Sequence, residues 1–387
     1  MREARWISTG FFAAVLTLSA APAAGQRPAT PVAYPASFAA AAGPGFSGDD
    51  PAPAFWRELG DTVLTRLVES ALAASPDVRL AAARVAEARA ARRLAVLDLA
   101  PTVTSTGGYD RGRLSAAQLP GATAEQRAVR SWDAGVGGAW ELDVFGRNRH
   151  NLRARDALAG AAVEELGDAR LALAAEVAAA YLDLRGAQLR LAVALRNAEN
   201  QRRTLGLTEE RLSAGRGNAF DTERARALMQ LTLATTPLLQ ARIEGARNRL
   251  ARLGGGADPG VEGAAGLAGA LPPLPAAVRV GSPQRLLRAR PDVAAAERRL
   301  AAQEQLAGAQ RAEYLPRLSL VGGAGLNATS WDSLGRGGAG RYQAGVAVSW
   351  PFLDMGRVRT QSGVARARSD QARAAYASTA LRALEEA

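Results

Sequence analysis

The stretch SWDAGVGGAWELDVFGR, residues 131–147, has a counterpart 210 positions later in RYQAGVAVSWPFLDMGR, residues 341–357. In both copies an aromatic residue precedes a Trp by eight positions, and Gly-Arg follows that Trp after six positions. Between the two aromatic positions, apolar or small residues occupy every second place. A period of two predicts a β-strand with one apolar face, so the chain contains the same kind of strand twice.

The apolar faces of these two strands each carry an aromatic residue at both ends. The first face comprises Trp132, Ala134, Val136, Gly138, Trp140 and Leu142, and the second comprises Tyr342, Ala344, Val346, Val348 and Trp350. Eight residues span about 26 Å along a strand, or roughly 20 Å in height for strands tilted by ~40°. An apolar band with an aromatic girdle at each edge is typical of a membrane-spanning strand. A soluble sandwich strand that ends in aromatic residues is the alternative.

A second marker extends the duplication. Pro76-Asp-Val recurs as Pro291-Asp-Val after 215 positions, and in both copies a further Pro, 25 residues on, opens a strand-like run. Four strands are therefore predicted, over residues 102–110, 132–142, 317–326 and 342–352. Polar, Gly-rich loops over residues 111–131 and 328–341 join them in pairs. Spanning barrels begin at eight strands, so the chain must oligomerise. A dimer supplies eight strands and a trimer twelve.

The residue inventory argues against several classes of protein. The 387 residues carry a formal net charge of +11, and all 48 basic residues are Arg. One His (His150) and no Cys leave no thiol nucleophile, disulfide or ordinary zinc site. Arg alternates with Asp and Glu, and aromatics make up only 5%, whereas a nucleic-acid interface gathers Arg beside stacking aromatics. We expect no enzyme, cofactor, metal or nucleic acid, and interpret His150 as an exposed residue at a helix start.

The N-terminus predicts a secretory signal peptide. Arg2 and Arg5 precede an apolar run over residues 6–20, and cleavage is expected after Ala24 or Gly25. The run is shorter than the ~20 apolar residues that a spanning helix needs, and a short membrane anchor is the alternative. No other stretch is as apolar, so a membrane-spanning chain must close its strands into a barrel. Because the chain has no Cys, we expect no lipid anchor.

Residues 147–213 predict one long helix, because the stretch has no Pro and only isolated Gly. At 1.5 Å per residue such a helix is about 100 Å long, which suits a tube or a bundle rather than a compact domain. Larger apolar residues recur at steps of 7, 4, 4, 3, 7 and 4 in a coiled-coil-like stripe: Leu166, Leu173, Val177, Tyr181, Leu184, Leu191 and Leu195.

The chain reverses after this helix. Gly215 and Gly217 permit positive φ at the helix end, and Asn218, with Asp221 three residues on, can cap the returning helix. From the residues alone the turn is an ordinary hairpin loop. The return helix is predicted over residues 219–253, with a kink where Pro237 removes a backbone hydrogen bond.

The duplication defines the domain organisation, and the second copy is shorter than the first. After Gly-Arg the first copy continues for 106 residues and the second for 30, so about 75 residues of a complete second repeat are expected to be absent. The predicted organisation is a signal peptide (1–25), an N-terminal linker (26–54), repeat 1 (55–254), a connection (255–282) and an incomplete repeat 2 (283–387).

Several motifs together resemble a known family. The most specific is VGSPQRLLRARPDV (residues 280–293), followed by AERRL (296–300) and YLPRLSL (314–320); FWRELGD (55–61) and WELDVFGR (140–147) also match. They are similar to the outer-membrane factors of tripartite efflux and type I secretion systems, the TolC-like and OprM-like channels, especially the NodT branch that serves resistance-nodulation-division (RND) pumps. The resemblance covers about residues 50–387.

This resemblance implies an α+β membrane protein that forms a homotrimer. Twelve strands would form one transmembrane β-barrel, and long helical hairpins would form a periplasmic α-barrel. A periplasmic adaptor protein would join the hairpin tip, which by position comprises Arg211, Leu212, Gly215 and Asp221, and an inner-membrane RND pump would supply the cargo. The aromatic girdle in outer-membrane lipid would be Trp132, Trp140, Tyr342 and Trp350. The family's closing gate would fall in the absent C-terminal segment.

The main hypothesis is thus a passive exit duct for drugs or small molecules in the outer membrane. A type I protein-secretion channel, served by an ABC transporter, is the alternative within transport. A non-functional truncated product, or a soluble periplasmic coiled-coil protein, is the alternative outside it. The exported substrate is not predicted, because a duct that passes many molecules need not bind any of them tightly.

Overall fold

The computed structural model describes residues 38, 45–49, 52, 54–256 and 269–386. The chain forms two units, Met1–Ala33 and Tyr34–Ala387, and everything below concerns the second unit. The predicted signal peptide and most of the predicted linker lie outside the described residues.

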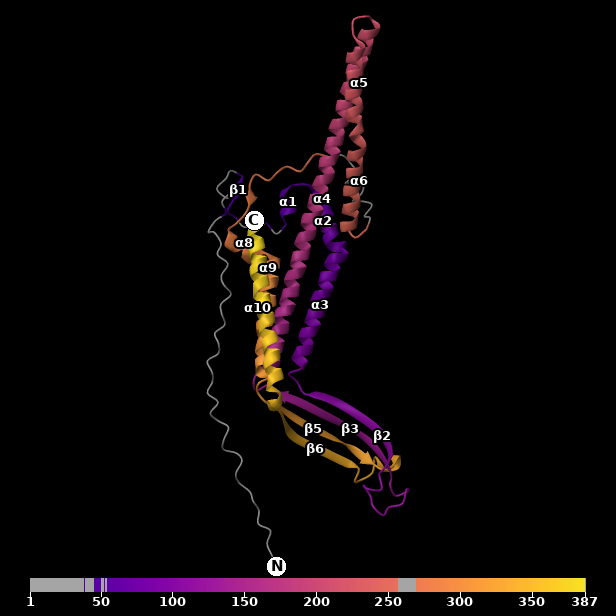
Figure 1. The fold of residues 1–387 in the computed structure, drawn as a ribbon, viewed down its shortest axis with the longest axis vertical. Coiled ribbons are helices and arrows are strands. Elements are labelled where there is room, and N and C mark those ends of the chain that lie inside the picture. The colour runs from indigo at the N-terminus through magenta and orange to yellow at the C-terminus, as the bar shows by residue number, and fades with distance from the viewer. Residues whose placement is uncertain (1–37, 39–44, 50–51, 53, 257–268, 387) are drawn as a thin grey trace, which may run out of the picture. The chain divides into compact units, whose positions relative to one another are not determined.

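Long helices lead into a four-stranded sheet within this unit (Figure 1). The first part of the chain forms β1 (Phe46–Ser47), α1 (Phe55–Glu58), α2 (Thr62–Ala74), α3 (Pro76–Leu97), β2 (Thr102–Arg113), β3 (Ala128–Leu142), α4 (Arg147–Ser213), α5 (Ala219–Ala234) and α6 (Thr236–Leu253). The second part forms β4 (Val278–Arg279), α8 (Pro283–Ala289), α9 (Pro291–Ala312), β5 (Arg317–Ala328), the 3-10 turn η2 (Trp331–Ser333), β6 (Gly340–Ser349), the 3-10 turn η3 (Phe352–Asp354) and α10 (Met355–Glu385). β1 and β4 pair in parallel as a small separate ladder.

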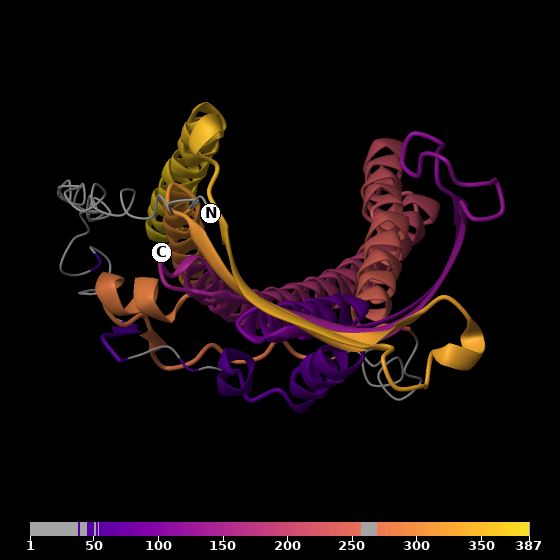
Figure 2. The same ribbon diagram turned by 90° about the horizontal axis from the view of Figure 1, so that it is seen from below.

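The four predicted strands are present and form one antiparallel sheet in the order β2-β3-β5-β6. Figure 2 shows these strands following a curved path. The first pair is longer than predicted, because residues 111–113 pair with residues 128–130. β6 is shorter than predicted and leaves Trp350 one residue beyond its end. Pro351 explains this end, since proline has no N–H to continue a ladder.

The internal duplication is visible in equivalent hydrogen bonds. α3 and α9 each contain 22 residues and begin at a proline, and β2 and β5 each contain 12 residues. The indole N–H of Trp140 donates to the carbonyl oxygen of Leu99 at 2.9 Å, and that of Trp350 donates to Tyr314 at 3.1 Å. Leu99 and Tyr314 are 215 positions apart. Equivalent tryptophans therefore make equivalent hydrogen bonds to the turn between helix and strand in both copies.

α4 has the predicted bounds and contains 67 residues. The return helix is interrupted at Thr235, which separates α5 from α6. Pro237 lacks the N–H that would otherwise reach the carbonyl of Leu233, and the Thr236 hydroxyl donates to that carbonyl at 2.8 Å instead. The predicted kink is confirmed as a break of one residue.

The main apolar core lies where α1, α2 and α6 pack on the middle of α4. The predicted stripe supplies four buried residues, Leu173, Val177, Tyr181 and Leu184, and the core also contains Trp56, Leu64, Leu67, Val68, Ile243, Leu250 and Leu253. Leu195 ends the stripe and is 50% exposed. The stripe is therefore buried only where the shorter helices cover it.

Candidate functional sites: the hairpin tip and the apolar sheet face

The hairpin tip, residues 211–221, is built by a regular helix-ending motif. The backbone N–H of Arg216 donates to the carbonyl of Arg211 at 2.9 Å, and that of Gly215 donates to Leu212 at 3.0 Å. These two bonds form a Schellman motif, which requires a left-handed residue, and Gly215 has φ of +70°. The sequence therefore turns here because a glycine stands at the one position that needs positive φ.

Gly217 serves a different purpose from the one predicted. It does not adopt positive φ; instead, a Cβ at this position would lie 3.1 Å from the backbone nitrogen of Leu212. The predicted cap is confirmed, because the Asn218 side chain accepts a hydrogen bond of 2.8 Å from the backbone N–H of Asp221. The chain can therefore reverse within five residues between Ser213 and Ala219.

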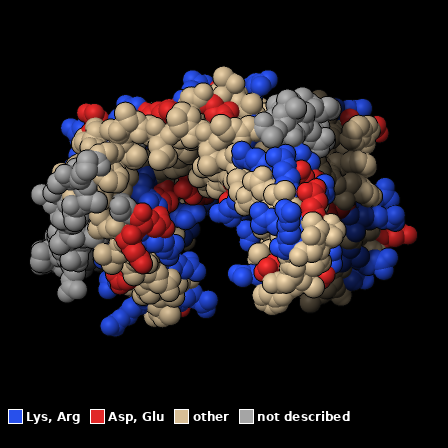
Figure 3. All heavy atoms as spheres, turned by 90° about the horizontal axis from the view of Figure 1, so that it is seen from above, with Lys and Arg blue, Asp and Glu red and all other residues tan. Residues whose placement is uncertain are grey.

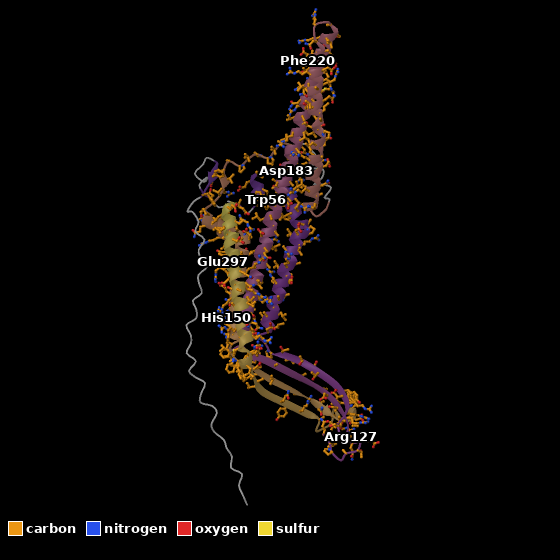
Figure 4. All side chains as sticks on the ribbon, viewed as in Figure 1. Trp56, Arg127, His150, Asp183, Phe220 and Glu297 are labelled. Atoms are coloured by element: carbon orange, nitrogen blue, oxygen red, sulfur yellow. The ribbon has the colours of Figure 1, made fainter. Side chains whose placement is uncertain are left out.

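Within the described part of the chain, the charged side chains of Arg211 and Asp221 are free for a partner. Every residue from 211 to 220, and Asp221, is exposed, and no side-chain hydrogen bond or ion pair of Arg211 or Asp221 occurs within the described part of the chain. Phe220, 72% exposed, points outward at the end of the hairpin (Figure 4). Phe220 was not among the predicted tip residues, although an aromatic residue beside a capping motif was a readable signal. The four predicted tip residues thus lie together on one exposed turn.

The second site is the apolar sheet face. Residues that pair across strands point to the same side, and the register brings Trp132, Trp140 and Tyr342 of the predicted girdle to this side. The apolar sheet face consists of Val103, Ser105, Gly107, Tyr109, Trp132, Ala134, Val136, Gly138, Trp140, Leu142, Leu318, Leu320, Gly322, Ala324, Leu326, Ala328, Tyr342, Ala344, Val346 and Val348, with Trp350 just beyond. Tyr342, Val346 and Val348 are 90%, 63% and 66% exposed. An exposed apolar surface across four strands marks a contact with membrane or protein.

Aromatic contacts gather at both ends of this face. Away from the helices, the Trp132 ring lies 4.4 Å from that of Tyr109 and 5.2 Å from that of Trp331, measured between centroids. Next to the helices, Trp350 lies 5.7 Å from Phe352. Tyr109, Trp331 and Phe352 were not predicted from the sequence, because their contacts depend on strand register and on the short turns η2 and η3.

The opposite face of the sheet is polar and rich in glycine. Asn327 donates to Asp133 at 2.6 Å, and Arg341 forms an ion pair with the same carboxylate at 3.1 Å. A Cβ on Gly325 would lie 2.5 Å from the carbonyl oxygen of Ala134, and one on Gly135 would lie 3.0 Å from that of Ala324. Glycines inside a strand mark bends and close approach, and here they let β3 and β5 crowd together on the polar side.

The junction between β3 and α4 is tied by charged groups. Asp143 accepts hydrogen bonds of 2.9 Å from the backbone N–H groups of both Asn148 and Arg149. Burial raises the pKa of Asp143, but the N–H donors and the Arg149 guanidinium outweigh burial and hold that pKa below its usual value. Arg147 binds Glu141 with two hydrogen bonds of 3.0 and 2.7 Å. The Gly-Arg motif therefore fixes the point where strand becomes helix.

The expectation that His150 is an exposed residue was wrong. His150 is half-buried against α9, with Nδ1 2.8 Å from Oε1 of Gln305. A Cβ on Gly308 would lie 2.8 Å from the same Nδ1, so this glycine makes room for the ring. The close approach of α4 and α9 was not readable from either helix alone.

None of the described helices is both long and apolar enough to cross a membrane. In the described residues there is also no group of three or more acidic or His side chains placed to hold a metal ion.

Comparison with known proteins identifies the class. The family described as outer membrane efflux protein matches residues 67–256 and 282–386. The outer membrane protein OprJ of Pseudomonas aeruginosa is 32% identical over 363 residues, which cover 93% of this chain and 74% of OprJ. Nodulation protein T of Rhizobium leguminosarum bv. trifolii is 28% identical, covering 88% of this chain and 72% of that protein. The solved structure of the outer-membrane channel OprN superposes with a TM-score of 0.86 at 39% identity, covering 92% of this chain and 79% of that chain.

The chain therefore belongs to the outer membrane efflux protein family. The predicted resemblance, the α+β fold class and the outer-membrane location are confirmed. Members of this family are efflux channels rather than enzymes.

Proposed function

We propose that this chain is the outer-membrane exit channel of a tripartite, RND-type efflux complex, a passive duct for drugs or other small molecules. The observation that carries the proposal is the apolar sheet face, which is exposed over four strands and edged by aromatic residues at both ends. In this proposal the face lies against outer-membrane lipid, and Trp132, Trp140, Tyr342 and Trp350 sit at its edges. Transport is powered by the inner-membrane pump.

Strand register supports closure of the sheet with other copies. Tyr342 pairs with Ala324, which pairs with Val136, so Tyr342 is displaced by four residues from Trp132 toward the helices. Trp350 is displaced from Trp140 by the same amount. Strands tilted in a barrel need such a stagger to bring equivalent residues to one depth. We propose a homotrimer whose twelve strands close one barrel.

The helices form the periplasmic part in this proposal. Seen from the hairpin end in Figure 3, one side of the unit is hollowed, and its walls carry basic and acidic side chains among uncharged ones. Such walls suit a water-filled duct better than a ligand pocket, which is mostly apolar. The proposed organisation keeps the signal peptide (1–25), linker (26–54), repeat 1 (55–254), connection (255–282) and repeat 2 (283–387).

The hairpin tip is the proposed docking site of a periplasmic adaptor protein. Arg211 stands in the last turn of α4 and Asp221 in the first turn of α5, where helix dipoles favour their charges. Because neither charge is used within the described chain, both are available to an adaptor. Leu212, 37% exposed, and Phe220 add apolar contact beside them.

Membrane fractionation tests the channel proposal. We expect the protein in the outer-membrane fraction, as an oligomer of three copies that resists dissociation in detergent until it is heated. A monomer in the periplasmic extract would instead support a soluble coiled-coil protein and reject the channel.

Cross-linking tests the tip. The chain has no Cys, so Ser213→Cys places a single thiol at the exposed tip, and Ser378→Cys places one at an exposed position of α10 as a matched control. We expect an adaptor cross-link from the tip variant only. Equal cross-linking from both positions, or from neither, contradicts the assignment. A type I secretion channel is recognised in the same experiment, because the captured complex would contain an ABC transporter in place of an RND pump.

A further inference from the structure

Three arginines extend the apolar sheet face beyond its aromatic end. Tyr109 pairs with Trp132 across β2 and β3; two residues further from the helices Arg111 pairs with Arg130, and Arg113 then stands opposite Ala128. Alternation along the strands places all three guanidinium groups on the same side as the aromatic rings. Arg127, which precedes β3, marks this end of the sheet in Figure 4.

These like charges are not neutralised within the described chain. Like charges directly opposite each other destabilise a strand pair, yet no ion pair or side-chain hydrogen bond of Arg111, Arg113 or Arg130 is present among the described residues. The carboxylates of β2 and β3 nearest to this row, Asp110 and Asp133, point to the polar face. Asp133 is in addition already bound by Asn327, Ser131 and Arg341.

Elsewhere in the described chain, some arginines are neutralised by a carboxylate of the same chain. Arg147 binds Glu141 on both carboxylate oxygens, and Arg226 binds Glu209 at 2.8 Å even though both side chains are about half exposed. The arginine row of Arg111, Arg113 and Arg130 differs from single unpaired arginines such as Arg211, because Arg111 and Arg130 stand directly opposite each other with no carboxylate bound to either. It calls for a negatively charged group from outside the chain.

The height of the row indicates the source of that group. The arginine pair lies about 7 Å beyond the Tyr109–Trp132 pair along the strands, and an aromatic girdle stands at the boundary between hydrocarbon and headgroups. The guanidinium fork matches two phosphate oxygens at once. We infer that Arg111, Arg113 and Arg130 bind the phosphate groups of anionic lipid headgroups around the far end of the sheet. This inference rests on the proposed membrane position of the apolar sheet face.

Short-chain lipids provide the test. The purified full-chain oligomer in uncharged detergent is titrated with dihexanoyl phosphatidic acid, with dihexanoyl phosphatidylcholine and with inorganic phosphate, and its dissociation temperature is measured. We expect phosphatidic acid to raise this temperature and the other two to leave it unchanged. In Arg111→Gln/Arg130→Gln the apparent affinity for phosphatidic acid should fall about 30-fold, since each arginine contributes roughly five- to sixfold near an anionic surface and the two factors multiply.

Two further variants separate binding from folding. Arg89→Gln/Arg93→Gln removes two exposed arginines of α3 and should bind phosphatidic acid like the unmodified protein. Arg111→Lys/Arg130→Lys keeps the charge but loses the fork, and should bind with intermediate affinity. If the Gln variant does not assemble, the three titrations of the unmodified protein and of the Lys variant still test whether these arginines bind an anionic lipid.

Several outcomes overturn the inference. An equal shift with phosphatidylcholine would show that charge is not recognised, and an equal shift with inorganic phosphate would show that a lipid is not required. Undiminished affinity in the Gln variant would show that the row is not the site. Failure of the proposed function is distinct, because the protein would then not reach the outer membrane as an oligomer at all.

Discussion

The helical region and the sheet of this chain are stabilised in different ways. In the helical region, Leu64, Val68, Tyr181 and Leu184 are fully buried by neighbouring helices of the same chain. In the four-stranded sheet, Ala328 is the one strand residue among those described that counts as buried. The helical region therefore contains its own apolar core, whereas both faces of the sheet are exposed in a single copy of the chain.

One copy of the chain can therefore bury the apolar side chains of its helical region by itself, but those of its sheet can be buried only by contacts outside the chain. Burying a large apolar side chain stabilises a fold by roughly 1.5–3 kcal/mol, and the sheet gains little of this within one copy. Lipid on the apolar face and further copies at the β2 and β6 edges would supply it in the proposed channel. Substitutions in the two regions should accordingly have different effects.

The largest effect is expected in the helical core. Leu184→Ala removes a side chain with 0% exposure and should lower the free energy of unfolding by about 3 kcal/mol. Heat denaturation of the purified protein, followed by helix circular dichroism, measures the loss. Leu195→Ala on the same helix is the control, because Leu195 is 50% exposed and its truncation should cost at most about 0.5 kcal/mol. Similar losses in both variants would mean that α2 and α6 do not cover Leu184 in solution.

The sheet should respond to added volume on its polar face. Gly325→Ala introduces a Cβ 2.5 Å from the carbonyl oxygen of Ala134, which must push β3 and β5 apart at a cost of about 2 kcal/mol. Gly345→Ala on the same face is the matched control, since nothing lies within 4 Å of its Cβ. The yield of heat-resistant oligomer measures the effect. A Gly325→Ala protein that assembles as well as Gly345→Ala would show that the close approach is dispensable.

The same two regions also show where sequence reasoning succeeds. The bounds of α4 were predictable because the stretch lacks Pro and its larger apolar residues recur at helical spacing. The strand faces were predictable because apolar residues occupy every second position. The partly buried contact between Asp61 and Tyr181 was not predictable, because it joins residues 120 positions apart. The arginine row was missed for a related reason: Arg111 and Arg130 become neighbours only through strand register. The tip residues were predicted through family resemblance, and their exposure, with the unpaired charges of Arg211 and Asp221, is visible only in the structure.

A moderate, pH-dependent effect is expected where α2 begins. Asp61 caps α2 and accepts a hydrogen bond of 2.6 Å from the Tyr181 hydroxyl. Burial raises the pKa of Asp61, but the bonds from Tyr181, Leu64 and Val63 outweigh burial and hold that pKa below its usual value. Because the folded pKa is the lower one, the stabilisation is complete above the unfolded value of about 3.9 and is lost as the pH falls through the folded pKa.

Tyr181→Phe tests this pair. At pH 7 the variant should lose about 1–2 kcal/mol, since it leaves a partly buried carboxylate with one partner fewer. The difference from the unmodified protein should shrink as the pH falls below the usual Asp value and through the lowered pKa of folded Asp61, where the carboxylate becomes neutral. Denaturant titrations between pH 3 and pH 7 measure both quantities. In an Asp61→Asn background the effect of Tyr181→Phe should no longer depend on pH; a dependence that persists there would assign the titration to another group.

The smallest effect compares the two repeats directly. Trp140→Phe and Trp350→Phe each remove one indole hydrogen bond to a backbone carbonyl, that of Leu99 or Tyr314. The indoles are 38% and 49% exposed, so water can replace the lost donor and each variant should lose less than about 1 kcal/mol. Unfolding temperatures of the two variants should agree closely, because the duplication places the same bond at the same strand end. A large decrease in unfolding temperature for one variant alone would mean that the two helix–strand junctions contribute unequally to stability despite their common geometry.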